Sequence, residues 1–215
     1  MTDHKKATFQ INSIPFITNT LLIPHIQQFK DTNPDLRINI KSQIQRTDFI
    51  FGETDVAIRH QKGNEPSLHY EPLSPVFITP ICSPEYLRKK SSPQLSDHKL
   101  IGLESDRYSL PIWGKQWNQD SPPEDELCLD NYQAVLEVVK QGTGLAMGYF
   151  PSLVPLLKKG CIVLPFPKQI SEFDQLYLVY LNTNKLNSTI LSFQCWIKQL
   201  TRELLSDKNI LFESE

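Results

Sequence analysis

The sequence is poor in glycine and lacks any long run of apolar residues. Its 8 glycines are outnumbered by 16 prolines, whereas average proteins contain about 7% glycine and about 5% proline. The apolar runs all fall short of the roughly 18 residues that a membrane helix needs, and the first residues are polar. We therefore expect a cytoplasmic chain with no membrane partner and with frequent, stiff turns.

The sequence also lacks paired cysteines and catalytic motifs. No two cysteines form a Cys-x-x-Cys pair, which predicts reduced core thiols rather than metal ligands or nucleophiles. There is no Gly-x-Ser-x-Gly elbow, no phosphate-binding glycine-rich loop and no spacing of histidines and acids suited to zinc. We expect no catalytic residue, no metal and no cofactor. The cysteines are Cys82, Cys128, Cys161 and Cys195.

Neither sign of charge dominates. The chain has 22 Lys and Arg against 24 Asp and Glu, a formal net charge of −2, and no stretch gathers basic residues on one face. Direct binding of nucleic acid is not expected, because it depends on a concentrated positive surface. With 40% hydrophobic and 21% charged residues, the composition is typical of an ordinary folded domain.

Segments with strand character alternate with amphipathic helical segments. Strands are predicted at residues 7–14, 36–40, 55–59, 68–73, 76–82, 100–103, 127–129, 145–149, 161–164 and 176–181. Helices are predicted at residues 21–30, 45–51, 84 onward, 109–119, 132–141, 151–159 and 188–205, several after capping residues such as Thr18, Asn19, Ser83 and Asn131. This alternation predicts the α/β class with mainly parallel sheets.

Two sheets are favoured over one. Pro80 interrupts the strand predicted at 76–82, which argues for a bend or a change of lobe rather than a central strand. The strand at 176–181 is placed to return to the first lobe. We predict residues 1–79 plus 178–215 as lobe I and residues 80–177 as lobe II, with a ligand cleft between them.

Motifs in one uninterrupted order then resemble a known family. They are Leu21-Leu22-Ile23-Pro24, Asn33-Pro34, Asp55-Val56-Ala57-Ile58-Arg59-His60, Pro80-Ile81-Cys82-Ser83-Pro84, Gly142-Thr143-Gly144 and Pro165-Phe166. This order resembles the effector-binding domain of LysR-type transcriptional regulators, in the branch that includes the glycine-cleavage activator. The resemblance covers nearly the whole chain.

The resemblance implies a type 2 periplasmic-binding-protein fold that binds a small-molecule effector between two lobes. It also implies a homo-oligomer, in which the first helix, about residues 21–30, pairs with the helix at 132–141 of another copy. Such regulators reach DNA through an N-terminal winged helix-turn-helix, which is missing from this chain. Phe16 and Ile17 replace the small hydroxyl residue that is common near the ligand, so this side of the cleft is expected to be more apolar.

Several residues are candidates for contact with a ligand. Helix starts at Thr18-Asn19 and Asn131 would aim free amides at the cleft, which favours an anion by about 0.3 to 1 kcal/mol per exposed site. Arg59 could clamp a carboxylate, although a pair with Asp55 or Glu53 is an equal alternative. The full set is Phe16, Ile17, Thr18, Asn19, Ser42, Gln43, Arg59, His60, Asn131 and Tyr149.

Simpler interpretations stand beside these. The capping residues can serve their helices alone, Ser42 and Gln43 can be ordinary surface residues, and a lone histidine such as His60 is more often structural. Trp113 and Trp117 share one helix face and are expected in the core rather than at a ligand. The favoured function is ligand sensing, of a small anionic metabolite, in a LysR-type regulator. A free-standing solute-binding protein is the alternative, and an enzyme on the same fold is a third.

Overall fold

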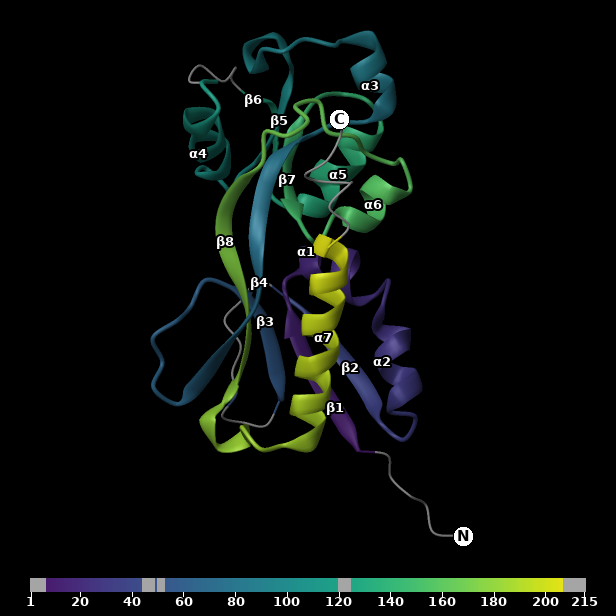
Figure 1. The fold of residues 1–215 in the computed structure, drawn as a ribbon, viewed down its shortest axis with the longest axis vertical. Helices are drawn as coiled ribbons and strands as arrows, with labels where there is room; N and C mark the ends of the chain where they lie inside the picture. Colours follow the sequence, from purple (N-terminus) through teal and green to yellow (C-terminus); the bar gives the residue numbers. More distant parts are fainter. Residues whose placement is uncertain (1–6, 44–48, 50–52, 120–124, 207–215) are drawn as a thin grey trace. The chain divides into compact units, whose positions relative to one another are not determined.

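The computed structural model describes residues 7–43, 49, 53–119 and 125–206 (Figure 1). The chain forms two compact units. Unit 1 comprises Met1–Pro75 with Asp174–Glu203, and unit 2 comprises Val76–Phe173 with Leu204–Glu215. Two long strands, β4 (Leu68–Ile81) and β8 (Ser171–Leu181), belong to both units, because the divisions fall inside them. The lobe boundaries predicted after residues 79 and 177 lie in the same two strands.

Unit 1 is built on a parallel group of three strands. The central strand β1 (Thr8–Ser13) pairs in parallel with β2 (Arg37–Ser42) on one side and with β3 (Val56–His60) on the other. β3 in turn pairs with β8 in the antiparallel sense. The helical elements of unit 1 are α1 (Pro15–Ile17), the π-helix η1 (Thr18–Leu22), α2 (Ile26–Thr32), the short 3-10 turn η3 (Asn182–Asn184) and α7 (Ser188–Ser206), of which the last three residues are assigned to unit 2.

Aromatic rings form much of the unit 1 core. Phe29 of α2 and Phe193 of α7 meet edge to face with their ring centroids 5.2 Å apart, and Phe9 of β1 lies 5.4 Å from Phe193. All three are buried. Such pairs add about 0.5 to 1.5 kcal/mol beyond the burial of their apolar area. The buried ring of Phe193 therefore anchors α7 to the sheet that contains β1.

Unit 2 combines an antiparallel and a parallel pair of strands. The end of β4 pairs with β7 (Ala146–Phe150) in the antiparallel sense, and β5 (Leu100–Leu103) pairs in parallel with β6 (Asp125–Leu129). A single parallel bridge joins Leu100 to Leu145. The helices are α3 (Pro84–Lys89), the 3-10 turn η2 (Leu95–Asp97), α4 (Ser109–Gln116), α5 (Tyr132–Lys140) and α6 (Val154–Lys158).

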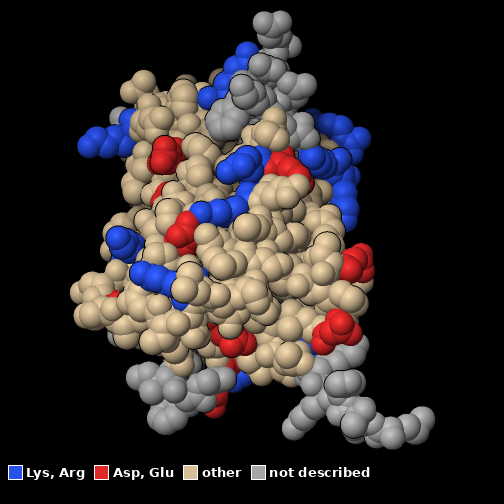
Figure 2. Space-filling model, turned by 60° about the horizontal axis from the view of Figure 1, so that its bottom comes forward, with Lys and Arg blue, Asp and Glu red and all other residues tan. Residues whose placement is uncertain are grey.

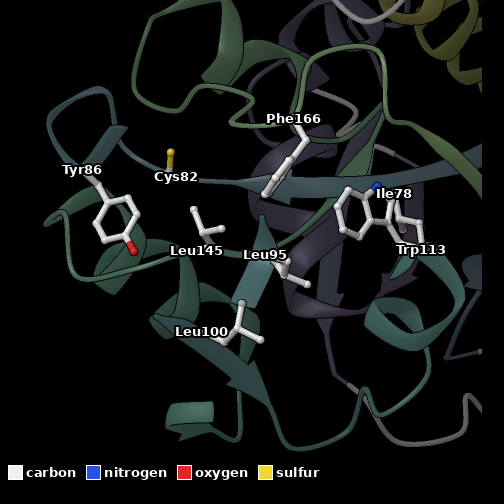
Figure 3. Close-up of a cluster of buried hydrophobic side chains, with 8 residues drawn as sticks. All are labelled: Ile78, Cys82, Tyr86, Leu95, Leu100, Trp113, Leu145 and Phe166. Carbon is white, nitrogen blue, oxygen red and sulfur yellow. The ribbon is translucent and has the colours of Figure 1, made fainter. Parts of the chain in front are cut away.

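Trp113 is the largest side chain in the core of unit 2 and is fully buried. Figure 3 shows it with Phe166, whose ring centroid lies 5.2 Å away, among the side chains of Ile78, Cys82, Tyr86, Leu95, Leu100 and Leu145. Its indole N–H donates to the carbonyl of Gln169 at 2.6 Å. Trp117 packs against the same cluster. The prediction that both tryptophans serve the core is confirmed.

The first helical segment begins earlier than predicted. It starts at Pro15, because proline is favoured at the first helical position, and the N–H of Thr18 already donates to the carbonyl of Ile14 at 3.0 Å. Thr20 donates its hydroxyl to the carbonyl of Phe16 at 2.7 Å, as a residue inside a helix does. The prediction of a helix start at Thr18-Asn19 is therefore wrong. The predicted helix 21–30 is also divided, since η1 ends before Pro24 and α2 begins after it.

Three further expectations change. β4 is one continuous strand through Pro72, Pro75 and Pro80, because proline and the residue before it both favour extended backbone. Only an isolated bridge at Val163 represents the strand predicted at 161–164, and the larger sheet is mixed rather than mainly parallel. The helix predicted at 45–51 lies outside the described residues apart from residue 49.

The cysteines do not share one environment. Cys82 is buried in the unit 2 core, as predicted, and Cys161 is half-buried. Cys128 and Cys195 are exposed, so the prediction of a core position is wrong for these two. Both belong to elements with one open face, β6 and α7, and a cysteine in such an element can point either way.

On the face drawn in Figure 2, charges of both signs are interspersed with uncharged surface.

Candidate functional site

Unit 1 gathers polar side chains where its parallel strands end. β1 ends at Ser13 and β2 at Ser42, and these two residues are direct partners in the parallel register. Ser13 is also opposite Ile58 of β3, one residue before Arg59. Carboxyl ends of parallel strands are where open α/β sheets bind ligands. We call the residues Asn12, Ser13, Thr18, Ser42, Gln43 and Arg59 the unit 1 edge.

Hydrogen bonds hold the unit 1 edge together around Ser13. Its hydroxyl lies 2.5 Å from the hydroxyl of Thr18, and both side chains are buried. Its carbonyl accepts from the backbone N–H of Gln43 at 3.0 Å. Ser42 is exposed and Gln43 is half-buried. The structure therefore brings together Thr18, Ser42 and Gln43, which the sequence nominated separately.

Arg59 is held by Asn12. Its Nη2 donates to the amide oxygen of Asn12 at 2.7 Å and its Nη1 donates to the carbonyl of Ile58 at 2.9 Å. The two acidic residues considered as its partners make other bonds, since Asp55 accepts from the N–H of Gln10 at 2.7 Å and Glu53 pairs with a lysine. Burial lowers the pKa of Arg59 from its usual value, and an arginine so placed still carries its charge at neutral pH.

The amide nitrogen of Asn12 is a second unusual feature of the unit 1 edge. The side chain is 1% exposed, and its Nδ2 has no hydrogen-bond partner among the residues that the structure describes. A buried amide donor without a partner costs about 1 to 3 kcal/mol, so such groups call for an explanation. Sequence reasoning did not nominate Asn12, because an asparagine inside a strand carries no ligand signal of its own.

The remaining candidates in unit 1 have ordinary structural environments. Phe16 and Ile17 are buried, and Asn19 is exposed on η1. Nδ1 of His60 lies 3.8 Å from a carboxylate oxygen of Asp174. Burial lowers the pKa of His60, and the charge of Asp174 opposes that shift. His60 is therefore neutral at pH 7, which fits the structural interpretation better than a role as a charged anchor.

Unit 2 contains a cavity of about 390 Å³. This is within the range of about 300 to 1,000 Å³ that is usual for small-molecule sites. Its apolar walls come from Pro80, Leu100, Ile101, Leu103, Leu110, Pro111, Val135, Ala146 and Met147. Its polar and amphipathic lining comes from Gly102, Glu104, Asp106, Arg107, Ser109, Cys128, Tyr132 and Tyr149. We call this space the unit 2 cavity.

Asp106 organises the polar wall of the unit 2 cavity. One carboxylate oxygen accepts from the backbone N–H groups of Tyr108 and Ser109, at 3.1 and 3.0 Å. The other accepts from the hydroxyls of Ser109 and Tyr149. Asp106 thereby binds free backbone N–H groups at the start of α4, two residues before its N-cap Tyr108. It also links α4 to β7 across the cavity wall.

Both tyrosines of the cavity are held in the neutral form. Burial, the adjacent Asp106 carboxylate and its hydrogen bond raise the pKa of Tyr149. Burial raises the pKa of Tyr132 well above its usual value, and its hydroxyl donates to the carbonyl of Met147 at 2.5 Å. The two rings meet nearly edge to face with centroids 5.1 Å apart. The tyrosines therefore supply hydroxyl groups and ring surface to the cavity, and no charge.

Tyr149 is the nominated residue that lines the unit 2 cavity. Asn131 caps α5 as predicted, since its side chain accepts from the N–H of Ala134 at 2.9 Å, and its neighbour Tyr132 reaches the cavity. Asp106 and Ser109 were missed. An aspartate just before a predicted helix is a capping signal, and this could have identified Asp106 ahead of the helix predicted at 109–119.

The described residues contain neither a metal-binding cluster nor a membrane-spanning helix. Among residues 7–43, 49, 53–119 and 125–206, no group of three His, Cys, Asp or Glu side chains is placed to hold a metal ion. No helix in the same part of the chain is both long and apolar enough to cross a membrane.

Comparison with known proteins gives one consistent result. Residues 2–202 match the family described as the LysR substrate binding domain. The chain is 24% identical over 200 residues to the glycine cleavage system transcriptional activator of Escherichia coli K12, covering 89% of this chain and 64% of that protein. It is 23% identical to the transcriptional activator AmpR of Pseudomonas aeruginosa, covering 92% of this chain and 67% of that protein. The chain thus spans about two thirds of the length of these relatives.

Solved structures show the same fold. The effector domain of AmpR from Pseudomonas aeruginosa superimposes with a TM-score of 0.76 at 22% identity, covering 93% of this chain and 98% of that one. The regulatory domain of CrgA from Neisseria meningitidis gives a TM-score of 0.75 at 19% identity, covering 91% and 99%. The predicted α/β fold of the type 2 periplasmic-binding-protein kind is confirmed.

Proposed function

Because the chain belongs to the LysR substrate binding domain family, we propose that it is the ligand-sensing part of a transcriptional regulator and has no enzymatic role. The observation that carries this proposal is the unit 2 cavity, which has the size of a small-molecule site and combines apolar walls with a single organised polar wall. Relatives matched over most of this chain are transcriptional activators, which supports a regulatory role over that of a free-standing solute-binding protein.

We further propose that the ligand carries an anionic group. Arg59 supports this, because Asn12 fixes its guanidinium at the unit 1 edge and burial keeps water from screening it fully. Thr18, Ser42 and Gln43 add hydroxyl and amide groups around Ser13. The placement of the ligand between two lobes stays a prediction, and so do direct contacts with Phe16, Ile17, Asn19, His60 and Asn131.

Binding would act by changing the relative populations of two arrangements of the lobes or of the subunits. A ligand shifts an equilibrium between two arrangements only by the difference between its affinities for them. The response would reach DNA through a winged helix-turn-helix module outside this sequence, in an assembly of several copies and in the cytoplasm. The formal net charge of −2 agrees with indirect rather than direct contact with DNA.

A thermal-shift screen tests ligand sensing. The purified chain is heated with a panel of small carboxylates, dicarboxylates and amino acids, each over a range of concentrations. A true ligand stabilises the folded state by about 2.7 kcal/mol at one hundred times its Kd, so the melting temperature should rise with concentration. If no member of the panel produces a saturable rise, the proposal of an anionic ligand is wrong.

Variants then test whether the unit 1 edge binds the anionic group of the ligand. Arg59→Gln should weaken a carboxylate hit at least tenfold in titration calorimetry. Arg88→Gln, an exposed arginine on α3, serves as the matched control and should leave the affinity unchanged. Equal affinity of Arg59→Gln and the wild-type chain would remove the unit 1 edge from the site. Regulation itself is tested by joining the chain to a helix-turn-helix module and measuring whether the hit changes reporter transcription.

A further inference from the structure

The hydroxyl protons of the unit 2 cavity all point at acceptors within the protein. Tyr149 and Ser109 both donate to the same carboxylate oxygen of Asp106. Tyr132 donates to the carbonyl of Met147 at 2.5 Å. A hydroxyl has one proton and two lone pairs, so any further bond that these oxygens make is one in which they accept. These hydroxyl groups can therefore only accept further hydrogen bonds.

Asp106 strengthens those acceptors. A hydroxyl that donates to a carboxylate becomes a better acceptor, because chains of hydrogen bonds polarise one another. The carboxylate itself already takes four hydrogen bonds, which is about its full capacity. Its negative charge nevertheless acts across the cavity, and the same field contributes to the raised pKa of Tyr149.

From this arrangement we propose that the unit 2 cavity selects an apolar group that carries an ammonium, with the ammonium placed against the polar wall formed by Tyr149 and Asp106. The apolar walls take the hydrocarbon part, and the wall of acceptors beside a carboxylate takes the charged donor. Among the charged lining residues, the carboxylates of Glu104 and Asp106 outnumber the single cation of Arg107. A carboxylate of the same shape would meet oxygen lone pairs and a like charge.

This inference rests on the proposed function, since it names the ligand chemistry of a ligand-sensing domain. It concerns residues other than those of the unit 1 edge, which we propose for an anionic group. The two proposals can therefore fail separately.

A matched series of cyclohexyl compounds tests the inference. Cyclohexylmethylamine, cyclohexylmethanol and cyclohexanecarboxylate share one ring and differ in the polar group. Each is titrated into the 215-residue chain by calorimetry at pH 7.0. The amine should bind at least tenfold more tightly than the carboxylate, with the alcohol between them. Equal or tighter binding of the carboxylate, or no binding of the amine, overturns the inference while leaving the carboxylate screen of the unit 1 edge standing.

Leu110→Trp tests whether the amine binds in the unit 2 cavity. The larger ring should fill part of the unit 2 cavity and abolish binding of the amine, and its thermal unfolding without ligand reports whether the variant is folded. Amine binding that survives in a folded Leu110→Trp chain lies elsewhere, which contradicts the inference. Asp97→Asn is the matched control for the Asp106→Asn variant described below, because Asp97 accepts a hydrogen bond from Ser92 away from the cavity lining. It should bind the amine as the wild-type chain does.

Asp106→Asn gives a sharper result. The amide oxygen can still accept from the N–H groups of Tyr108 and Ser109, so the start of α4 is retained. The amide nitrogen takes the place of the second carboxylate oxygen and donates to the two hydroxyls, whose own protons then turn into the cavity. The preference should invert, with the amine at least tenfold weaker and the carboxylate tighter than in the wild-type chain. An unchanged order of affinities in this variant contradicts the inference, because a merely structural role of Asp106 would not move it.

Discussion

The amide oxygen of Asn12 accepts a hydrogen bond from Nη2 of Arg59 at 2.7 Å, across two neighbouring parallel strands. This bond ties the one arginine of β3 to a buried side chain of β1. A long, flexible guanidinium is thereby restricted before any ligand arrives, which lowers the entropy that binding must overcome. The orientation of Arg59 is therefore a property of the sheet and does not depend on the ligand.

Asn12→Ala is expected to lower anion affinity with little net change in stability. Removal of the acceptor leaves a partly buried guanidinium short of one bond, but it also removes the unpartnered Nδ2, so two changes of about 1 to 3 kcal/mol oppose each other in the free energy of unfolding. Calorimetry with a carboxylate hit should show weaker binding, and urea denaturation reports the stability. Asn39→Ala, on the neighbouring strand β2 and only half-buried, is the control and should leave the affinity unchanged. Equal affinity of the two variants would contradict the positioning role of Asn12.

Phe193→Ala is expected to destabilise the chain by about 3 to 5 kcal/mol. The ring is fully buried and meets Phe9 and Phe29 at centroid distances of 5.4 and 5.2 Å, so its loss leaves a cavity at the centre of the unit 1 core. The midpoint of urea denaturation measures the change. Leu191→Ala on the same helix is the comparison, and its 40% exposure predicts a change within about 0.5 kcal/mol. The interpretation is wrong if both variants lose the same stability.

Acidification is expected to destabilise the chain in part through His60. Its pKa in the folded chain lies below the unfolded value, so below the unfolded pKa of about 6.5 only the unfolded chain gains this proton. The contribution of His60 therefore falls as the pH drops from about 7.5 through 6.5 toward the folded pKa. Urea denaturation at several pH values should show a shallower pH dependence for His60→Gln.

Asp174 supplies the control for that experiment. Its charge raises the pKa of His60 against the effect of burial, so Asp174→Asn should lower that pKa further and extend the loss of stability to lower pH. A pH dependence that is the same in the wild-type chain and in His60→Gln would show that His60 does not contribute.

Cys82 is expected to resist thiol reagents in the folded chain. Burial raises its pKa to about 12, so the reactive thiolate is scarce at pH 8, and the side chain is enclosed in the unit 2 core. Cys128 and Cys195 are exposed and should be alkylated first. Mass spectrometry after brief treatment with iodoacetamide distinguishes the positions, and the same treatment in urea should label every cysteine. Early labelling of Cys82 would show that this core opens readily.

Sequence reasoning was most accurate where the signal is local. Ser83 before Pro84 and Asn131 before α5 each cap a helix, because a cap is decided by a residue and the amides two or three places on. The same local reasoning failed at Thr18, where Pro15 already provides an earlier start. Two plausible starts so close together cannot be ranked without the tertiary contacts of the segment.

The candidate sites were harder to predict because their members are distant in sequence. Asp106 and Tyr149 lie 43 positions apart, and Asn12 and Arg59 lie 47 apart. Each residue alone has an ordinary explanation, and only the pairing of strands and helices brings the partners together. The expectation that parallel strands bind ligands at their carboxyl ends is why Arg59 could be nominated, whereas Ser42 was nominated from the family resemblance.

The two long strands have a genetic consequence. Because β4 and β8 each run through the division between the units, neither unit corresponds to an uninterrupted stretch of gene. A fragment that starts at residue 76 or stops at residue 173 cuts a strand in two. Recombination that swaps one half for that of a paralogue must therefore splice inside hydrogen-bonded strands, so we expect exchange of the whole domain to be better tolerated than exchange of one unit.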